Sequence, residues 1–202
     1  MLWSPAVRAL VQYALWQLRL AKADTQTTRA ERATLARHAR QRLRPVEIGV
    51  WQGVTTKVLR AAMAADAELW AIDPYVVGRL GVSFPELIAH GEVDGVENGK
   101  VRWIKKTAKD AAALWQLEAR PPADFVFVDG DHSWEGISAD WSAWSGLVSV
   151  GGVIGLHDSR STPARRIDDA GSVRFTQSHV LKDPRFRKVD EVDSLTVVER
   201  IA

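Results

Sequence analysis

The sequence contains no cysteine and no long uninterrupted apolar run. Without cysteine the 202-residue chain has no disulfide framework and no cysteine-based zinc site, and its redox compartment is left open. The N-terminal stretch MLWSPAVRALVQYALWQLRLAKAD is interrupted by Arg8, Gln12 and Arg19, and it lacks a basic head followed by a cleavage site. We therefore expect neither a transmembrane helix nor a signal peptide, and we expect a cytoplasmic protein.

Charge is nearly balanced over the whole chain, with a net value of +2, but it is distributed unevenly. Residues 1–44 carry nine Arg or Lys against two acids, and the remainder is mildly acidic. Residues 1–26 are predicted to form a basic helix whose polar stripe runs from Arg8 to Lys22. The pattern favours packing of this helix on its own domain or on a partner in a homodimer. Contact with a membrane or nucleic-acid surface is the less favoured alternative.

Helix and strand signals alternate over residues 27–202, which are predicted to form one domain. The spacing of Thr28 and Glu31 is that of a capping box, and the helix it starts is expected to run to Pro45. Residues 75–100 are longer than a plain crossover needs and predict an inserted loop or short helix. Apolar runs predict five strands, at 46–50, 69–73, 101–106, 124–129 and 151–158.

The C-terminal segment FRKVDEVDSLTVVERI differs, because it predicts two strands joined tightly around Asp193 and Ser194. With no helix between them, these strands should be antiparallel. Apolar strands separated by helices are typical of a parallel sheet covered on both faces. The expected fold class is therefore α/β, with a Rossmann-like, seven-stranded, mostly parallel sheet, an antiparallel C-terminal strand pair, and helices on both faces.

Polar residues stand where four of the predicted parallel strands end. They are Glu47 and Gly49 on the first strand, Asp73 on the second, Asp129 on the fourth, and His157 with Asp158 on the fifth. A single acid or glycine at a strand end has an ordinary structural explanation. Because ligands of such sheets bind beyond the carboxyl ends of the strands, the four ends together predict a ligand site there.

The turn after the first strand indicates which ligand is bound. A dinucleotide-binding turn needs three spaced glycines, but after Gly49 this chain has Trp51 and Val54 at the second and third positions. Gly53 still allows a tight turn, and Asp73 follows about twenty residues later, where a carboxylate accepts ribose hydroxyls. The pattern disfavours NAD and favours a ligand with ribose, adenine and an amino-acid tail but no phosphate.

Four segments in this order resemble class I S-adenosylmethionine-dependent methyltransferases: VEIGVWQGVTTKVL, LWAIDPY, FVFVDGDHSWEGISADWSAW and GGVIGLHDS. The resemblance covers about residues 27–200 and is strongest to the bacterial branch that includes macrocin-type sugar O-methyltransferases and is related to catechol O-methyltransferases. It implies a methyltransferase domain over residues 27–202 that uses S-adenosylmethionine as cofactor.

The resemblance also implies a set of cofactor-binding residues: Glu47, Gly49, Trp51, Gly53, Asp73, Thr107 and Asp129. The acid and glycines of the first turn would line the methionine part, Asp73 would hold the ribose, and Thr107 would lie near adenine. Trp51 departs from the family pattern, which often has a glycine there. The loop is then bulkier but keeps its acid and its turn.

A metal site is implied at the ends of the fourth and fifth strands. In metal-using relatives an acid on the fourth strand and a ligand pair on the fifth hold magnesium, which lowers the pKa of a substrate hydroxyl. Asp129 and the pair His157 and Asp158 match these positions. Because magnesium prefers oxygen ligands, the imidazole favours manganese, another softer ion, or no metal.

His132 is the candidate general base. In macrocin-type relatives a histidine three positions after the strand-four acid takes the acceptor's proton, and His132 has this spacing from Asp129. An imidazole titrates near neutrality and suits this role. The alternative is that Asp131 and His132 only cap the next helix, with Ser133 as its N-cap.

Three function classes are consistent with these observations. The first is O-methylation of a small hydroxylated molecule, sugar-like or catechol-like. The second is methylation of nucleic acid or protein, which the basic first 44 residues favour and the absence of an NPPY-like motif after the fourth strand disfavours. The third is a cofactor-binding protein without catalysis, because a fold alone does not prove activity. The acceptor itself is not encoded in any motif, and residues 75–100 are the expected specificity segment.

Overall fold

The computed structural model describes residues 5–78 and 81–202, so residues 1–4 of the predicted N-terminal helix and 79–80 of the predicted insert lie outside the described residues. The strands are β1 (Pro45–Ile48), β2 (Glu68–Ile72), β3 (Lys100–Ile104), β4 (Ala123–Val128), β5 (Val148–Leu156), β6 (Phe186–Val192) and β7 (Leu195–Arg200). The helices are α1 (Pro5–Gln17), α2 (Arg29–Ala39), α3 (Val54–Ala62), α4 (Phe84–Asp94), α5 (Ala108–Leu117), α6 (Trp134–Trp144) and α7 (Gly171–Ser178).

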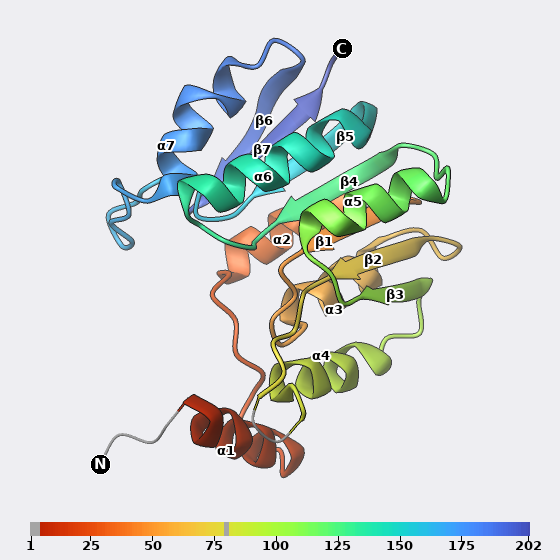
Figure 1. Cartoon of the computed structure of the whole chain (residues 1–202), viewed down its shortest axis with the longest axis vertical. Coiled ribbons are helices and arrows are strands. Elements are labelled where there is room, and N and C mark those ends of the chain that lie inside the picture. The colour runs from red at the N-terminus through yellow and green to blue at the C-terminus, as the bar shows by residue number, and fades with distance from the viewer. Residues whose placement is uncertain (1–4, 79–80) are drawn as a thin grey trace.

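The strands form one seven-stranded sheet in the order β3-β2-β1-β4-β5-β7-β6 (Figure 1). The first five strands are parallel, and β7 runs antiparallel to both β5 and β6. This arrangement confirms the predicted fold class, including the antiparallel C-terminal pair. Among the described residues, no helix is both long enough and apolar enough to cross a bilayer.

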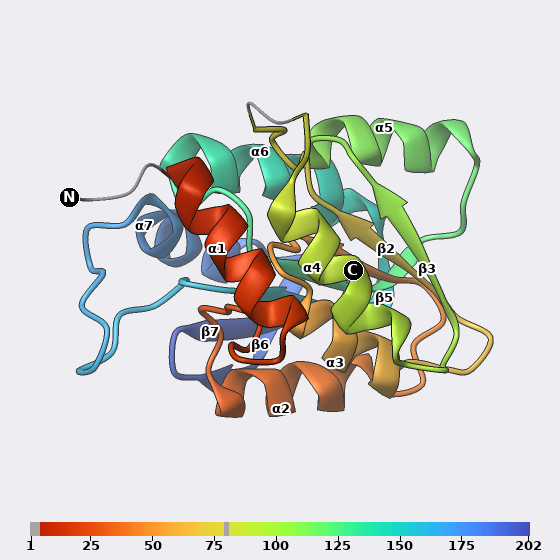
Figure 2. The same cartoon turned by 90° about the horizontal axis from the view of Figure 1, so that it is seen from below.

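Helices cover both faces of the sheet (Figure 2). α5, α6 and α7 lie on one face, whereas α2 and α3 lie on the other, with α4 beside α3. Under the first group, Trp115 packs edge to face against Trp70 and Trp144, with ring centroids 4.8 and 5.7 Å apart. Under the second group, Leu35 and Leu59 are fully buried. The tryptophans of α5 and α6 therefore belong mainly to the core.

Some element boundaries differ from the sequence prediction. α2 begins with the predicted capping box, but it ends at Ala39, well before Pro45. Arg40 leaves the helical conformation, and Gln41 adopts a left-handed φ of 59°. β5 starts at Val148, three residues earlier than its apolar pattern indicated. Local turn conformations that hydrophobic periodicity does not report set these ends.

Residues 75–100 contain α4, which connects the parallel strands β2 and β3. Ile88, Ala89 and Val93 form the buried side of this helix. The helix is thus the crossover that a parallel pair requires, and the extra length of the segment lies in the loop that precedes it.

The N-terminal helix α1 packs on α4, outside the main sheet-covering layer (Figure 2). Trp16 lies so close to Gly91 that a Cβ added there would be 2.4 Å from the indole ring. The indole Nε1 donates a 2.7 Å hydrogen bond to Glu92 Oε1. The helix ends at Gln17, so the predicted polar stripe does not continue along it to Lys22.

Replacing Trp16 by alanine is expected to lower the free energy of unfolding by about 2 kcal/mol, because a partly buried aromatic contact and a hydrogen bond are lost. For a chain of this size the melting temperature should fall by about 4–8 °C. Leu18→Ala is the matched control, because Leu18 is 68% exposed just beyond the helix. An unchanged melting temperature for Trp16→Ala would contradict the packing role and favour a surface anchor.

Candidate functional site

A cavity of about 600 Å³ lies at the carboxyl ends of the parallel strands. Its wall brings together several residues singled out from the sequence: Gly49, Trp51, Asp73, Thr107, Asp129 and His132. Residues 24–26, which connect α1 to α2, also line it and were not predicted. The cavity is therefore built from strand-end loops and closed in part by the N-terminal segment.

The loop between β1 and α3 approaches the end of β4 very closely. Gly49 has a φ of 86°, and a Cβ added there would lie 2.0 Å from the carbonyl oxygen of Asp129. Only glycine fits this position. Trp51 also has a left-handed φ, of 53°, and its side chain is 50% exposed at the cavity wall. The backbone is thus held against the cavity, and a large aromatic surface lies beside it.

Asp73 organises this loop from the end of β2. Its Oδ2 accepts hydrogen bonds from the backbone N–H groups of Val50 at 3.0 Å and Trp51 at 3.1 Å. Its Oδ1 accepts one from the N–H of Tyr75 at 2.8 Å. Each carboxylate oxygen has two acceptor sites, so Oδ1 retains one for a ligand hydroxyl.

Two residues of the predicted cofactor set, Glu47 and Gly53, do not line this cavity. Gly53 has a φ of 76° and packs on α4, where an added Cβ would lie 2.8 Å from the Cα of Ala89. The side chain of Glu47 is fully buried behind the loop. Burial raises the pKa of Glu47 well above its ordinary value, and the charges of Asp129 and Asp73 raise it further.

Glu47→Gln is expected to stabilise the fold increasingly as pH rises. Because the folded-state pKa of Glu47 is raised, the folded chain retains a proton that the unfolded chain releases above the ordinary glutamate pKa of 4.5. The free energy of unfolding of the wild type therefore falls as pH rises from 4.5 through the folded-state pKa of Glu47. The glutamine variant has no carboxyl group at this position, so its free energy of unfolding does not fall for this reason. Urea unfolding of both proteins over this range tests the prediction. A difference that shrinks as pH rises would contradict it.

The cavity wall also contains Thr107 and Asp140. Thr107 is the N-cap of α5, and its hydroxyl accepts from the N–H of Asp110 at 3.2 Å and donates to that residue's carboxylate at 2.8 Å. Asp140 was missed from the sequence. Burial raises its pKa to about 6, and the charge of Asp131 adds to the shift. Gly136 and Asp140 both line the cavity and lie four residues apart on α6, so they share one face of the helix. This spacing is the sequence signal that could have identified Asp140 as a site residue.

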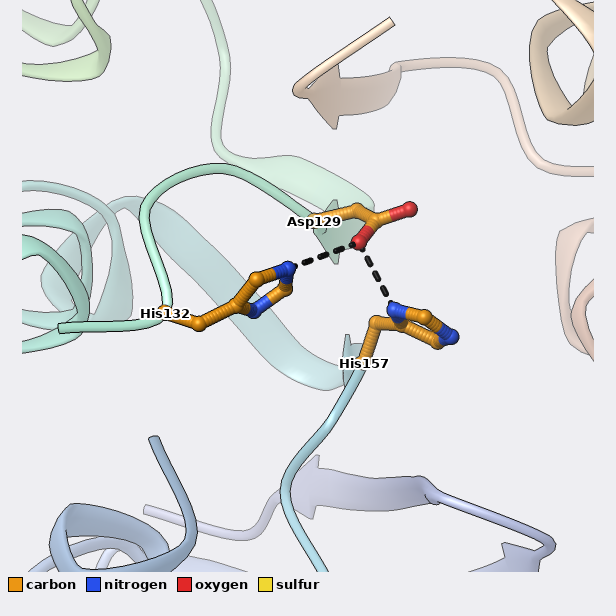
Figure 3. A group of neighbouring side chains, drawn as sticks. All are labelled: Asp129, His132 and His157. Atoms are coloured by element: carbon orange, nitrogen blue, oxygen red, sulfur yellow. Dashed lines mark ion pairs between the residues drawn. The ribbon is translucent and has the colours of Figure 1, made fainter. Parts of the chain in front are cut away.

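Asp129 lies between two imidazole rings (Figure 3). Its Oδ1 is 2.8 Å from Nδ1 of His157 and 3.7 Å from Nε2 of His132. His132 is partly exposed and lines the cavity, whereas the ring of His157 lies deeper. The predicted helix cap is also present, because the hydroxyl of Ser133 accepts a hydrogen bond from the N–H of Gly136 at the start of α6. This cap does not involve the side chain of His132. The helix cap and the position of His132 in the cavity wall are therefore compatible, and the structure has both.

His157 has a second carboxylate partner on its far side, Glu31 of α2. The distance from Nε2 of His157 to Oε2 of Glu31 is 3.4 Å, and the two residues are 2% and 1% exposed. Burial opposes a charged imidazole, yet Asp129 and Glu31 raise the pKa of His157 to about 10. Burial likewise opposes a charged Glu31, but bonds from His157, Thr28 and Ser194 lower its pKa to about 2. Both shifts favour the charged form of the group concerned.

Glu31 was missed from the sequence as a site residue because its capping box already explained it. One oxygen, Oε2, accepts from the backbone N–H of Thr28 at 2.7 Å, as a capping box requires. The other, Oε1, accepts from the backbone N–H and the hydroxyl of Ser194 at 2.9 and 2.7 Å. The same side chain thus caps a helix, fixes the β6–β7 turn and faces His157.

Asp158 lies behind the cavity and is not part of its wall. It is 3% exposed, and its Oδ2 forms an ion pair with Arg165 and lies 3.8 Å from Nε2 of His132. Its backbone carbonyl accepts a 2.6 Å hydrogen bond from the hydroxyl of Ser172. The predicted metal ligand is therefore already paired with a cation of the chain.

The donor set at this position does not fit the magnesium site that the resemblance implies. Asp129, His132 and His157 offer ligand atoms within 4.8 Å of one another, but two of the three are imidazoles. A histidine can bind a metal through one ring nitrogen and donate the N–H of the other to a carboxylate, so the carboxylates near His157 do not by themselves exclude it as a ligand. Asp129 then supplies the one certain oxygen ligand among the three, whereas magnesium demands several.

Comparison with known families identifies the fold's biochemical class. A family model described as a methyltransferase domain matches residues 46–159, which is more than half of the chain. The chain belongs to this family. Its identification as a class I S-adenosylmethionine-dependent methyltransferase is thereby confirmed. The match includes the β1–α3 loop, Asp73 and the DGDH segment, whereas Glu31 lies outside it.

Solved structures share the fold of this methyltransferase at low sequence identity. An O-methyltransferase from Bacillus cereus, in complex with SAH, has a TM-score of 0.63 at 18% identity, over 96% of this chain and 90% of that one. The O-methyltransferase TomG from Streptomyces achromogenes, in complex with SAM, has a TM-score of 0.66 at 18% identity, over 100% and 92%. An rRNA methylase from Streptococcus thermophilus has a TM-score of 0.58 at 12% identity, over 89% and 100%.

Proposed function

We propose that this methyltransferase transfers the methyl group of S-adenosylmethionine to a hydroxyl of a small molecule, sugar-like or catechol-like. The observation that carries the proposal is His132, an imidazole at the wall of the cavity beside the carboxylate of Asp129. O-methylation requires removal of the acceptor's proton, and an imidazole with an adjacent carboxylate is suited to take it. The O-methyltransferases among the structural relatives support the same class.

The cavity offers matching groups for the parts of the cofactor. The free acceptor site on Asp73 Oδ1 would bind a ribose hydroxyl, and the loop of Gly49 and Trp51 would pass beside the methionine part. Thr107 and Asp140, which also line the cavity, would lie beside the adenine. A cavity of about 600 Å³ lies within the range usual for ligands of this size.

The chemistry needs positioning and one proton transfer. The acceptor oxygen attacks the sulfonium methyl in line, so that a carbon–oxygen bond forms as the carbon–sulfur bond breaks. The acceptor's proton passes to His132, and the products are the methyl ether and S-adenosylhomocysteine. Asp129 and Asp158, 3.7 and 3.8 Å from His132 Nε2, stabilise the imidazolium that forms.

A screen for S-adenosylhomocysteine release tests the acceptor class. The purified protein is incubated with S-adenosylmethionine and with phenols, catechols, sugars, RNA or a peptide pool, and His132→Ala is run in parallel. Release that requires a phenol, catechol or sugar supports the proposal. Release with RNA or peptides alone would replace it with the second function class, which the basic first 44 residues favour. Homodimer formation and cytoplasmic location stay predictions.

Asp73→Ala is expected to weaken cofactor binding by about 10–150-fold. A hydrogen bond to a charged group contributes about 1.5–3 kcal/mol, and each 1.4 kcal/mol is about tenfold in affinity. Titration calorimetry with S-adenosylhomocysteine measures the change. Asp66→Asn is the control, because Asp66 is an exposed acid in the turn before β2. Equal affinity of Asp73→Ala and wild type would refute the assignment of Asp73 to the ribose.

A further inference from the structure

The wall of the cavity is rich in acidic side chains. Five aspartates line it, against two lysines around the start of α5, Lys106 and Lys109. The aspartates are Asp24, Asp73, Asp129, Asp131 and Asp140. A wall with this balance favours a positively charged ligand. S-Adenosylmethionine has two cationic groups, the sulfonium and the ammonium of its amino-acid tail, so the side chains of the wall fit this cofactor.

Four of these aspartates have other places in the structure. Asp73 accepts hydrogen bonds from the β1–α3 loop, and Asp129 lies between two imidazole rings. Asp131 accepts a 2.8 Å hydrogen bond from the backbone at the start of α6, and Asp140 lies further along that helix. Asp24 is the remaining acid. It belongs to the connector between α1 and α2, which runs past the carboxyl ends of the parallel strands (Figure 1).

Two contacts hold Asp24 against the β1–α3 loop. Its backbone N–H donates a 2.6 Å hydrogen bond to Oε1 of Gln52, which is buried. Its Oδ2 accepts a hydrogen bond from the indole Nε1 of Trp51 at 3.4 Å. In the described part of the chain, no lysine, arginine or histidine forms an ion pair with this carboxylate. Asp24 is therefore a positioned negative charge in the cavity wall with no cationic partner among these residues.

The contact with Asp24 gives Trp51 a role in the loop where the family often has glycine. A glycine at this position would supply neither the indole N–H nor an aromatic face, and such a face attracts cations. Glu47 is the acid that the resemblance assigns to the methionine part, but it is fully buried behind the loop and does not line the cavity. On the Trp51 side of the wall, the carboxylate that reaches the cavity is that of Asp24.

We infer that Asp24 binds the ammonium group of the cofactor's methionine part, and that Gln52 and Trp51 position it. The carboxylate would accept charge-assisted hydrogen bonds from this ammonium. The inference rests on the proposed function, because it takes S-adenosylmethionine as the ligand of the cavity. It adds a binding residue that lies outside the family-matched segment 46–159, and it makes the α1–α2 connector part of the cofactor site.

Two ligands that differ in the amino-acid tail test the inference. S-Adenosylhomocysteine has the ammonium, whereas 5′-methylthioadenosine keeps the nucleoside and the sulfur but lacks the tail. Asp24→Asn removes the charge and keeps both the backbone N–H for Gln52 and an oxygen that can accept from Trp51. Calorimetric titration is expected to show S-adenosylhomocysteine bound about tenfold more weakly by the variant, a loss of about 1.4 kcal/mol. The affinity for 5′-methylthioadenosine should change by less than about twofold, because this ligand has no ammonium to lose its partner.

Asp66→Asn is the control, because Asp66 is an exposed acid in the turn before β2, and it should change neither affinity. An unchanged affinity of Asp24→Asn for S-adenosylhomocysteine would overturn the inference. An equal loss for both ligands would overturn it as well, since the effect would then not depend on the tail. Glu47→Gln is measured in parallel. If that variant loses affinity for S-adenosylhomocysteine alone while Asp24→Asn does not, the ammonium is bound by Glu47 instead.

Failure of this inference is distinguishable from failure of the proposed function. A wild-type protein that binds both ligands, with an Asp24→Asn variant that binds them equally well, keeps the proposed function and loses the role of Asp24. A wild-type protein that binds neither ligand loses the cofactor, and the proposed function and the inference are then both wrong.

Discussion

Asp129→Asn is expected to reduce turnover by about 10⁴-fold, as loss of the carboxylate partner of a catalytic histidine does in other enzymes. The amide keeps the shape of the side chain but removes the negative charge between His132 and His157. The imidazolium that forms on His132 during proton transfer then loses its nearest counter-charge. Single-turnover rates with a saturating acceptor measure the effect.

Cofactor affinity should stay within about tenfold in Asp129→Asn, a change of at most about 1.4 kcal/mol. The charge lost faces two imidazoles and not the ribose end of the cavity. Asp66→Asn serves again as the control. If Asp129→Asn retains more than about a tenth of wild-type turnover, the carboxylate is not part of the reaction.

His132→Ala is expected to lower the rate of methyl transfer by about 10²–10⁴-fold, the usual contribution of a positioned general base. The melting temperature should change little, because the ring is partly exposed and Ser133 provides the helix cap.

His90→Ala is the matched control for His132→Ala. His90 lies on α4, where its ring stacks on Trp103 with centroids 4.0 Å apart. It has no place in the cavity wall, so its removal should leave the rate unchanged. If the rate of His132→Ala is within about tenfold of wild type, His132 is not the general base, and another group takes the proton of the substrate hydroxyl.

The strand-end residues were predictable from the sequence because the fold class fixes where they meet. Once β1, β2 and β4 are recognised as parallel strands, Gly49, Asp73 and Asp129 must lie along one edge of the sheet. What the pattern did not show is which of these side chains reach the cavity. The loop after β1 turns back so sharply at Gly49 that Glu47 is buried behind it.

The surroundings of His157 were not predictable in the same way. Its partner Glu31 is separated from it by more than a hundred residues, and local helix capping explained that glutamate completely. Asp158 was interpreted as a metal ligand, and its pairing with Arg165 depends on how the loop after β5 folds back. Long-range ion pairs of this kind leave no periodic signal in the sequence, because each residue has a sufficient local reason to be there.

The hydrogen bonds from Ser194 to Glu31 have a consequence for biosynthesis, because they join residues 163 positions apart. During synthesis α2 emerges well before the β6–β7 turn. Until that turn and β7 are synthesised, Glu31 lacks two of its donors and the sheet lacks the strand between β5 and β6. Such long-range contacts form late in folding. A nascent chain that has not yet reached β7 thus already contains every residue of the cavity wall, but it lacks the strand that joins β5 to β6 and the turn that binds Glu31.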